Sequence, residues 1–176
     1  MRILGISGSL STTSANATLL SLIGDLLGDE VDFSIYNGIG QLPHFNPETD
    51  IQPANTEVQR FRDELKDADA IIVCTPEYAF GVPGSLKNAL DWTVSSGELV
   101  NKPVALITAS LSGEKAQAAL LQTFTALSIN IVPQRILLLS FIRSKMDETG
   151  KLKNPEDMEA LKEVIESLKQ ARGSKL

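Results

Sequence analysis

The sequence is poor in the residues that build disulfide scaffolds, metal centres and nucleic-acid interfaces. It holds one cysteine and one histidine among 176 residues, and aromatic side chains make up 5% of it. A lone cysteine cannot form an internal disulfide, and no cluster of Cys, His or carboxylates has the spacing of metal ligands. The formal net charge is −6 and no block of Lys or Arg occurs, so the composition argues against nucleic-acid binding.

Long hydrophobic runs are also missing. The longest apolar stretch, residues 136–142, is far shorter than the about 20 residues that a membrane-spanning helix needs. The first residues enter a short apolar run and then a Gly/Ser loop, a pattern that does not fit a secretory signal. We therefore expect no membrane association and a cytoplasmic location.

What the sequence does contain is a regular alternation of short apolar runs and amphipathic stretches. The predicted strands are residues 2–7, 31–36, 68–75, 104–109 and 131–139, the last interrupted by a proline. The predicted helices are residues 15–27, 56–66, 83–95, 115–127 and 155–171. This alternation predicts one α/β domain over residues 1–176, with a doubly wound, five-stranded parallel sheet covered by helices on both faces.

The first predicted strand runs into a loop rich in hydroxyl groups, between Gly5 and Asn16. Backbone N–H groups and the positive end of the following helix suit such a loop to a phosphate. The loop has no Lys or Arg, and it matches neither the G-x-x-x-x-G-K-[ST] loop of nucleotide hydrolases nor the dinucleotide pattern G-x-G-x-x-G. Taken alone, it fits a phosphate site and a simple helix cap at Ser14 about equally well.

A second loop, residues 75–84, follows the third predicted strand and reads TPEYAFGVPG. Its prolines stiffen both ends, and its glycines allow another group to approach the backbone closely. A rigid loop that presents backbone donors and aromatic side chains suits a flat heterocycle. Taken alone, it is better explained as a tight strand-to-helix turn with Tyr78 and Phe80 as surface aromatics.

The two loops indicate a binding site more strongly together than either does alone. In a doubly wound sheet of strand order 2-1-3-4-5, the first and third strands are neighbours, and their connections leave in opposite directions. A crevice therefore opens at the carboxyl ends of these strands, between the hydroxyl-rich loop and the aromatic loop. A phosphate site beside a site for a flat ring describes a mononucleotide, and flavin mononucleotide (FMN) is the favoured ligand.

At these residues the sequence resembles the NADPH-dependent FMN reductase family, a flavodoxin-like group that includes quinone, azo-dye and chromate reductases. Residues 76–92, PEYAFGVPGSLKNALDW, resemble the long motif of the family's aromatic loop and the helix after it. Residues 8–16, GSLSTTSAN, resemble its Gly-Ser-x-Arg-x-x-Ser-x-Asn loop, and residues 42–46, LPHFN, resemble a stretch after its second strand. The resemblance runs from Arg2 to Leu139.

The resemblance implies that the FMN phosphate is bound by Ser9, Ser14 and Asn16. It implies that the flavin ring is held by the second loop, and that a third loop, here residues 109–114, also reaches the flavin. The candidate FMN-binding residues are Ser9, Ser11, Ser14, Ala15, Asn16, Pro76, Glu77, Tyr78, Ala79, Phe80, Gly81 and Ser110.

Three positions depart from the family pattern. Ser11 stands where the phosphate loop of the family has Arg, and Ala79 stands where Asn is frequent. Glu114 follows Gly113 where the family usually has a pair of glycines. These departures predict a divergent member of the family.

The activity that the resemblance implies is FMN-dependent oxidation of NADPH (or NADH). Hydride would pass from the nicotinamide to FMN and then to a quinone-like or other small electron acceptor, in ping-pong order. The redox chemistry belongs to the cofactor, so no catalytic side chain is expected. The alternative is a flavodoxin-like electron-transfer protein that binds FMN but has no nicotinamide site. The resemblance also implies a homodimer or homotetramer.

Overall fold

Five parallel strands form the centre of the computed structural model, which describes residues 1–50 and 55–171. They are β1 (Arg2–Ser7), β2 (Asp32–Tyr36), β3 (Ala70–Thr75), β4 (Val104–Ser110) and β5 (Ile136–Ser140). Their order in the sheet is β2-β1-β3-β4-β5, and every neighbouring pair is parallel. The predicted doubly wound, flavodoxin-like sheet is thus confirmed, including its strand order.

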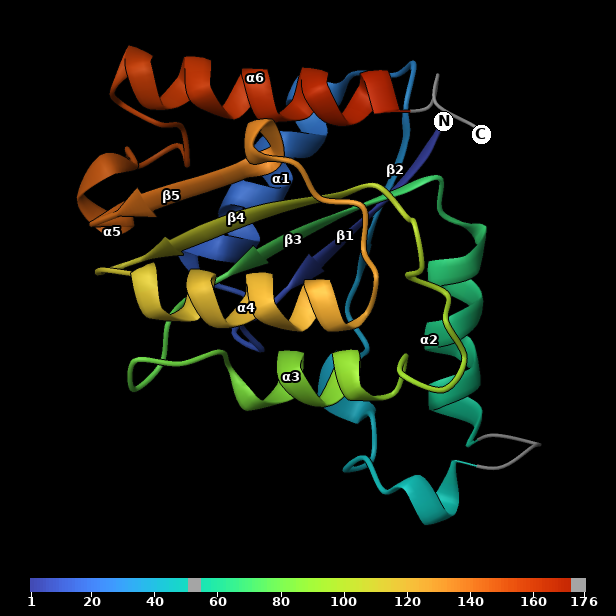
Figure 1. The fold of residues 1–176 in the computed structure, drawn as a ribbon. Helices are drawn as coiled ribbons and strands as arrows, with labels where there is room; N and C mark the ends of the chain where they lie inside the picture. The colour runs from blue at the N-terminus through green and yellow to red at the C-terminus, as the bar shows by residue number, and fades with distance from the viewer. Residues whose placement is uncertain (51–54, 172–176) are drawn as a thin grey trace.

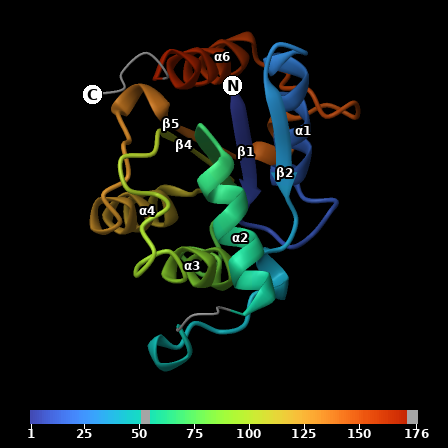
Figure 2. The ribbon, with the colours of Figure 1, turned by 90° about the vertical axis from the view of Figure 1, so that its right-hand side faces the viewer.

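Helices cover both faces of the sheet (Figures 1 and 2). One face carries α1 (Ala15–Leu27) and α6 (Pro155–Gln170), and the other carries α2 (Thr56–Asp67), α3 (Gly84–Asp91) and α4 (Glu114–Ala126). A one-turn helix, α5 (Ile142–Lys145), follows β5. Each face has its own hydrophobic core, since the buried side chains divide into two clusters with the sheet between them.

Burial along the strands follows their place in the sheet. Every residue of β3 and of β4 is buried, whereas β2 and β5, at the two edges, are partly exposed. Central strands of a parallel sheet are covered on both faces, which explains why β3 and β4 are continuous apolar runs rather than alternating ones.

The last strand begins later than the sequence predicts. The sequence predicts a strand over residues 131–139. In the structure β5 starts at Ile136, and Pro133–Arg135 forms a short 3₁₀ helix. Proline has no N–H to donate to a neighbouring strand, so the apolar residues before it cannot extend the ladder. The helix predicted over residues 83–95 also ends earlier, at Asp91. Both corrections leave the topology unchanged.

Candidate functional site

A pocket of about 430 Å³ opens at the carboxyl edge of the sheet. In Figure 1 the arrowheads of the strands point to this edge, where α5 and the loop before α3 lie. The lining comes from four segments that each follow a strand: Ser9, Ser14, Ala15 and Asn16 after β1; Pro76, Glu77 and Tyr78 after β3; Ala109, Ser110 and Leu111 at the end of β4; and Phe141, Ile142, Arg143 and Ser144 after β5.

The first wall of the pocket is the N-terminus of α1. Ser14 caps this helix, because its Oγ accepts a hydrogen bond of 3.1 Å from the N–H of Ala17. The N–H groups of Ala15 and Asn16 find no acceptor among the residues that the structure describes. Free N–H groups in the first turn, together with the positive end of the helix dipole, form a binding site for an anion such as a phosphate.

The side chain of Asn16 is turned into the core rather than toward the pocket. Its Nδ2 donates to the carbonyl of Ala109 at 3.1 Å, and its Oδ1 accepts from the thiol of Cys74 at 3.3 Å. Asn16 is 3% exposed, and burial raises the pKa of the Cys74 thiol far above its usual range. Asn16 therefore fixes α1 against β3 and β4, and its backbone N–H is the group that it offers to a ligand.

The second wall is a tight turn at Tyr78–Gly81. The two end residues exchange backbone hydrogen bonds of 3.0 and 2.9 Å, and the central residues Ala79 and Phe80 have φ angles of +48° and +60°. Positive φ at both central positions is the signature of a type I′ turn. The hydroxyl of Tyr78 lies 3.2 Å from Ser9 Oγ, so this turn is joined directly to the loop after β1. The two loops meet, as the strand order predicts.

Glu77 uses its carboxylate to tie the second wall to the third. The carboxylate accepts hydrogen bonds from Ser112 Oγ at 2.7 Å and from the N–H groups of Lys115 and Ala116, both at 2.9 Å. Burial acts to raise the pKa of Glu77, but these hydrogen bonds outweigh it and hold the pKa below its ordinary value. The side chain therefore caps the N-terminus of α4, where N–H donors and the positive end of the helix dipole stabilise its charge.

The third wall, after β4, is fixed by hydrogen bonds and by close packing. Ser110 Oγ accepts from the N–H of Glu77 at 3.1 Å, and Ser140 Oγ donates to the carbonyl of Ser112 at 2.9 Å. Gly113 has a φ of +110°, and a Cβ there would lie 2.8 Å from Leu138 Cδ1. This position requires glycine, so the single glycine that precedes Glu114 is sufficient for the turn into α4.

The fourth wall was missed by the sequence analysis. Phe141 adopts a left-handed conformation, with a φ of +57°, and its N–H donates to the carbonyl of Leu111 at 3.1 Å. The chain then turns back over the carboxyl edge as α5. Residues 141–144 match no motif, and the only available signal was their position directly after a parallel strand, where ligand-binding loops gather.

The structure brings most of the predicted site residues together. Those that line the pocket are Ser9, Ser14, Ala15, Asn16, Pro76, Glu77, Tyr78 and Ser110. Those that do not line it are Ser11, Ala79, Phe80 and Gly81. The second group lies on the outer parts of the same two loops, and the side chain of Phe80 is 79% exposed.

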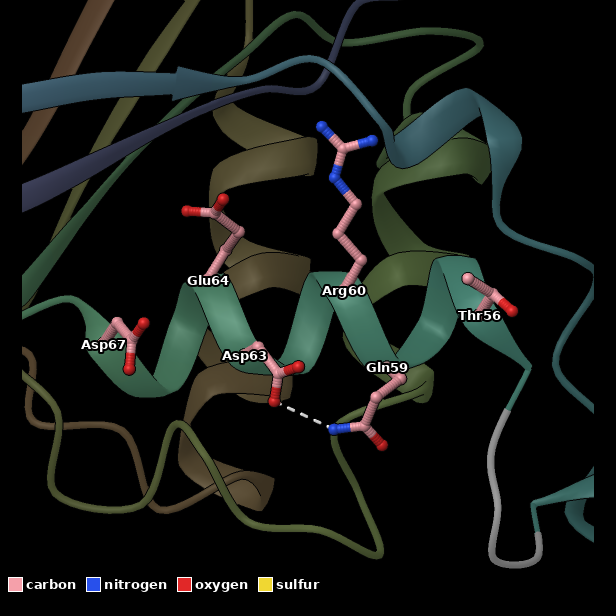
Figure 3. Close-up of a pocket in the computed structure, with 6 residues that line it drawn as sticks. All are labelled: Thr56, Gln59, Arg60, Asp63, Glu64 and Asp67. Atoms are coloured by element: carbon pink, nitrogen blue, oxygen red, sulfur yellow. Dashed lines mark hydrogen bonds between the residues drawn. The ribbon is translucent and has the colours of Figure 1, made fainter.

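A second hollow, of about 420 Å³, lies on the outer face of α2 and is shown in Figure 3. It is lined by Thr56, Gln59, Arg60, Asp63, Glu64 and Asp67. All of these polar side chains come from a single helix, and Gln59 donates to Asp63 at 2.9 Å. An open, polar helix face offers no apolar wall to a flavin ring, so we assign no ligand to it.

Within residues 1–50 and 55–171, no group of three or more His, Cys, Asp or Glu side chains is placed to hold a metal ion. No helix in the same part of the chain is both long enough and apolar enough to cross a membrane.

The pocket at the carboxyl edge fits the chemistry of FMN. Its volume lies within the range of roughly 300–1,000 Å³ that is usual for cofactor sites. The free N–H groups of Ala15 and Asn16 and the hydroxyl of Ser9 suit a phosphate, while Pro76 and Tyr78 offer flat surfaces for a ring. Glu77 is the one anion among the described residues of the lining, and its carboxylate accepts from N–H groups of α4 that stabilise its charge.

Comparison with known proteins agrees with this geometry. The sequence model of the NADPH-dependent FMN reductase family matches residues 1–143. An NAD(P)H-dependent FMN reductase of Pseudomonas aeruginosa is 30% identical over 175 residues, which cover 96% of this chain and 93% of the relative. An NADPH:quinone oxidoreductase of Arabidopsis thaliana is 33% identical over 178 residues, which cover 96% of this chain and 90% of the relative.

The fold is also shared with solved structures. A flavoenzyme NAD(P)H:acceptor oxidoreductase from Paracoccus denitrificans superposes with a TM-score of 0.79 at 23% identity, covering 98% of this chain and 97% of that chain. At this identity the likeness concerns the fold, and the sequence matches carry the family assignment. These sequence matches show that the chain belongs to the NADPH-dependent FMN reductase family.

Proposed function

We propose that the protein is an FMN-dependent NAD(P)H oxidoreductase that passes hydride from NADPH or NADH, through FMN, to a quinone-like or other small electron acceptor. The observation that carries the proposal is the pocket at the carboxyl edge, where the free N–H groups of α1 face the same space as the aromatic turn at Tyr78–Gly81. Membership of the family supports the same activity.

The phosphate of FMN is assigned to the first wall and the ring to the second and third. The N–H groups of Ala15 and Asn16 and the hydroxyls of Ser9 and Ser14 would hold the phosphate. The ring would lie against Pro76 and Tyr78 and beside the end of β4 at Ser110. Ser11, Ala79, Phe80 and Gly81 would act through the shape of their loops.

Hydride chemistry is what FMN supplies when it is bound, and the chain supplies position and electrostatics. The side chains that line the pocket have few free polar groups, because Glu77 and Asn16 are already hydrogen-bonded within the protein. We expect no side chain of this lining to act as a general acid or base, because the flavin carries the redox chemistry. Donor and acceptor would then use the same open side of the pocket in turn, which predicts ping-pong kinetics.

The test is a visible spectrum of the protein after it has been loaded with FMN and desalted. We expect flavin bands that remain with the protein, that bleach with NADPH under anaerobic conditions and that return on addition of a quinone. Initial rates at several quinone concentrations should give parallel double-reciprocal lines. Bound FMN that neither NADPH nor NADH reduces would identify an electron-transfer protein instead, and absence of bound flavin would reject both functions.

We propose further that the protein is a homodimer or homotetramer with its flavin sites near the subunit contacts. Large hydrophobic side chains are exposed around the mouth of the pocket and on the loops beside it: Leu10, Tyr78, Phe80, Leu111 and Phe141. Apolar side chains gathered on one edge of a protein often mark a contact surface. Light scattering at several protein concentrations tests the proposal, and a monomeric mass throughout would contradict it.

We also propose a cytoplasmic location, where NAD(P)H is available as the electron donor. The free, buried thiol of Cys74 is compatible with a reducing compartment. Activity recovered with the cytosolic fraction after cell lysis would support this location, and activity recovered outside the cell would contradict it.

A further inference from the structure

The pocket has two charged side chains in its described lining, and they differ in how far they are available to a ligand that carries a phosphate. Among the described residues that line it, Arg143 is the only cation and Glu77 is the only anion. The carboxylate of Glu77 is already held by Ser112 and by two backbone N–H groups of α4. Glu77 keeps its charge but directs its carboxylate at the N-terminus of α4, so Arg143 is the one charged side chain of this lining that is free to bind an anion.

Arg143 is held at the pocket by a well-anchored helix. Ile142, the residue before it, is 4% exposed and packs in the core beneath α1 and α6. Phe141 is hydrogen-bonded to the third wall through Leu111, and Lys145 forms an ion pair of 2.9 Å with Asp157 on α6. These contacts fix the backbone of α5 on both sides of Arg143, while its own side chain stays exposed.

The guanidinium of Arg143 has no ion pair or hydrogen bond with any described residue. It borders two neighbouring hollows, the pocket itself and a shallower one that it shares with Thr13, Ala15 and Thr18. Ala15 also lines both hollows, so Arg143 and the first turn of α1, where the free N–H groups are found, border the same two spaces. A cation with no partner among the residues that the structure describes is available to a bound anion.

Among the described residues, the acidic side chains near Arg143 form no ion pair with its guanidinium. Asp147 and Glu148 line the shallower hollow together with Arg143. The carboxylate of Asp147 already accepts hydrogen bonds from the N–H groups of Thr149 and Lys151, at 2.8 and 3.0 Å. Glu148 is exposed to solvent, where its interaction with a guanidinium is weakened by screening.

The loop after β1 lacks the cation that its family pattern contains, since Ser11 stands at the position of the family arginine. We propose that Arg143, from α5, binds the phosphate of FMN and supplies the positive charge that the loop lacks. This inference rests on the proposed function, because it concerns how the same site holds its cofactor. The cation thus comes from the far end of the sheet, after β5, rather than from the loop after β1.

The test is a fluorescence titration of the cofactor-free protein with FMN and, separately, with riboflavin, which has the same ring but no phosphate. Arg143→Gln should weaken FMN binding by about tenfold or more, as expected for loss of a hydrogen bond between charged groups. Riboflavin binding should not change. Arg143→Lys, which keeps the charge, should lose less FMN affinity than Arg143→Gln.

Two further variants make the test specific. Arg60→Gln removes the same charge from the exposed outer face of α2 and should leave FMN binding unchanged, which controls for net charge. In the Arg143→Gln protein, adding Ser11→Arg returns a cation to the loop after β1 and should restore FMN affinity. The FMN affinity of the parent protein should also fall with added salt more steeply than that of Arg143→Gln.

The outcomes separate this inference from the proposed function. If Arg143→Gln binds FMN as tightly as the parent protein, the inference is overturned and the proposed function stands. Equal weakening of FMN and riboflavin also overturns it, because Arg143 would then only shape the pocket. Unchanged FMN binding with a raised KM for NADPH would assign the cation to the electron donor instead. A parent protein that binds neither flavin would reject the proposed function itself.

Discussion

At the scale of single residues, Glu77 has a structural task that its place in a cofactor-binding motif does not reveal. Glu77→Gln removes the charge and one of the two carboxylate oxygens that accept from Ser112, Lys115 and Ala116. We expect the free energy of unfolding to fall by about 1–2 kcal/mol, as for the loss of a helix cap. Urea denaturation at neutral pH measures the change. Glu114→Gln, at the exposed start of the same helix, should cost no more than about 0.5 kcal/mol.

The contribution of Glu77 should also depend on pH in a defined direction. Its pKa in the folded protein lies below the ordinary value, although burial acts against this, because hydrogen bonds from α4 and Ser112 favour the ionised form. The stabilisation is therefore present above the pKa of the unfolded chain and is lost as pH falls through the folded value. The difference in unfolding free energy between the parent protein and Glu77→Gln should narrow in acid. A difference that stays constant would show that the charge is not involved.

The turn beside Glu77 stores backbone strain at Ala79 and Phe80. Both residues have positive φ angles, a conformation that costs most side chains about 1–2 kcal/mol and that asparagine tolerates better. Ala79→Asn should therefore raise the free energy of unfolding by roughly 0.5–1 kcal/mol, measured by the urea midpoint. The same exchange at Ala118, exposed within α4, should lower it by about 0.5 kcal/mol through helix propensity. Equal effects at the two positions would contradict the explanation by φ.

At the scale of elements, a buried ion pair fixes the connection between β2 and α2 against the end of α3. Arg62 Nη2 lies 2.8 Å from Asp50 Oδ1, and the two side chains are 4% and 6% exposed. Arg62 also donates to the carbonyl of Trp92, and Ser95 donates to Asp50. The pair therefore joins three segments that are distant in the sequence.

Breaking this pair should cost much more than breaking an exposed one. Asp50→Asn leaves the guanidinium of Arg62 buried without its counter-ion, and we expect a loss of about 3 kcal/mol in the free energy of unfolding. Asp91→Asn removes the exposed pair with Lys87 and should cost less than about 0.5 kcal/mol. Urea unfolding of the two variants under the same conditions gives the comparison. Similar losses would show that burial does not set the strength of the Asp50 pair.

The sequence predicts the central strands well and the edges less well. The runs 70–75 and 104–110 are buried on both faces, so their apolar character is continuous and visible without a partner. The first residue of β5 depends on where hydrogen bonding to β4 begins. The apolar pattern before Pro133 does not predict that position. Similarly, α3 ends at Asp91, after which the N–H and the hydroxyl of Thr93 both donate to the carbonyl of Leu90, although the apolar spacing continues beyond.

The candidate site was predictable where a motif marks a loop and where strand order brings the loops together. The walls after β1 and β3 are predicted in this way, whereas the wall after β4 is implied by the resemblance to the family. The wall after β5 was not, because it reaches the pocket through a left-handed residue, Phe141, that no sequence pattern marks. Sequence also could not show that the side chains of Asn16 and Glu77 are committed to hydrogen bonds within the protein.

At the scale of the whole molecule, the pocket joins segments that follow four of the five strands. We propose that residues 1–176 form one cooperative domain, so that a ligand in this pocket stabilises the entire fold and not one loop. A ligand that binds only the folded state adds stability according to its concentration, by about 2.7 kcal/mol at 100 times its Kd. For a domain of this size, FMN at that level should raise the thermal midpoint by roughly 5–10 °C.

Compounds that share only one part of FMN provide the controls for this rise in the thermal midpoint. Riboflavin carries the ring without the phosphate, and adenosine monophosphate carries a phosphate without the flavin ring. If the pocket binds FMN through both ends, each fragment at the same concentration should raise the midpoint less than FMN does, because each has the weaker affinity. Thermal unfolding followed by circular dichroism should give a single transition that moves as a whole. A second transition that does not move with FMN would contradict the single cooperative domain, and an equal shift with adenosine monophosphate would contradict recognition of the ring.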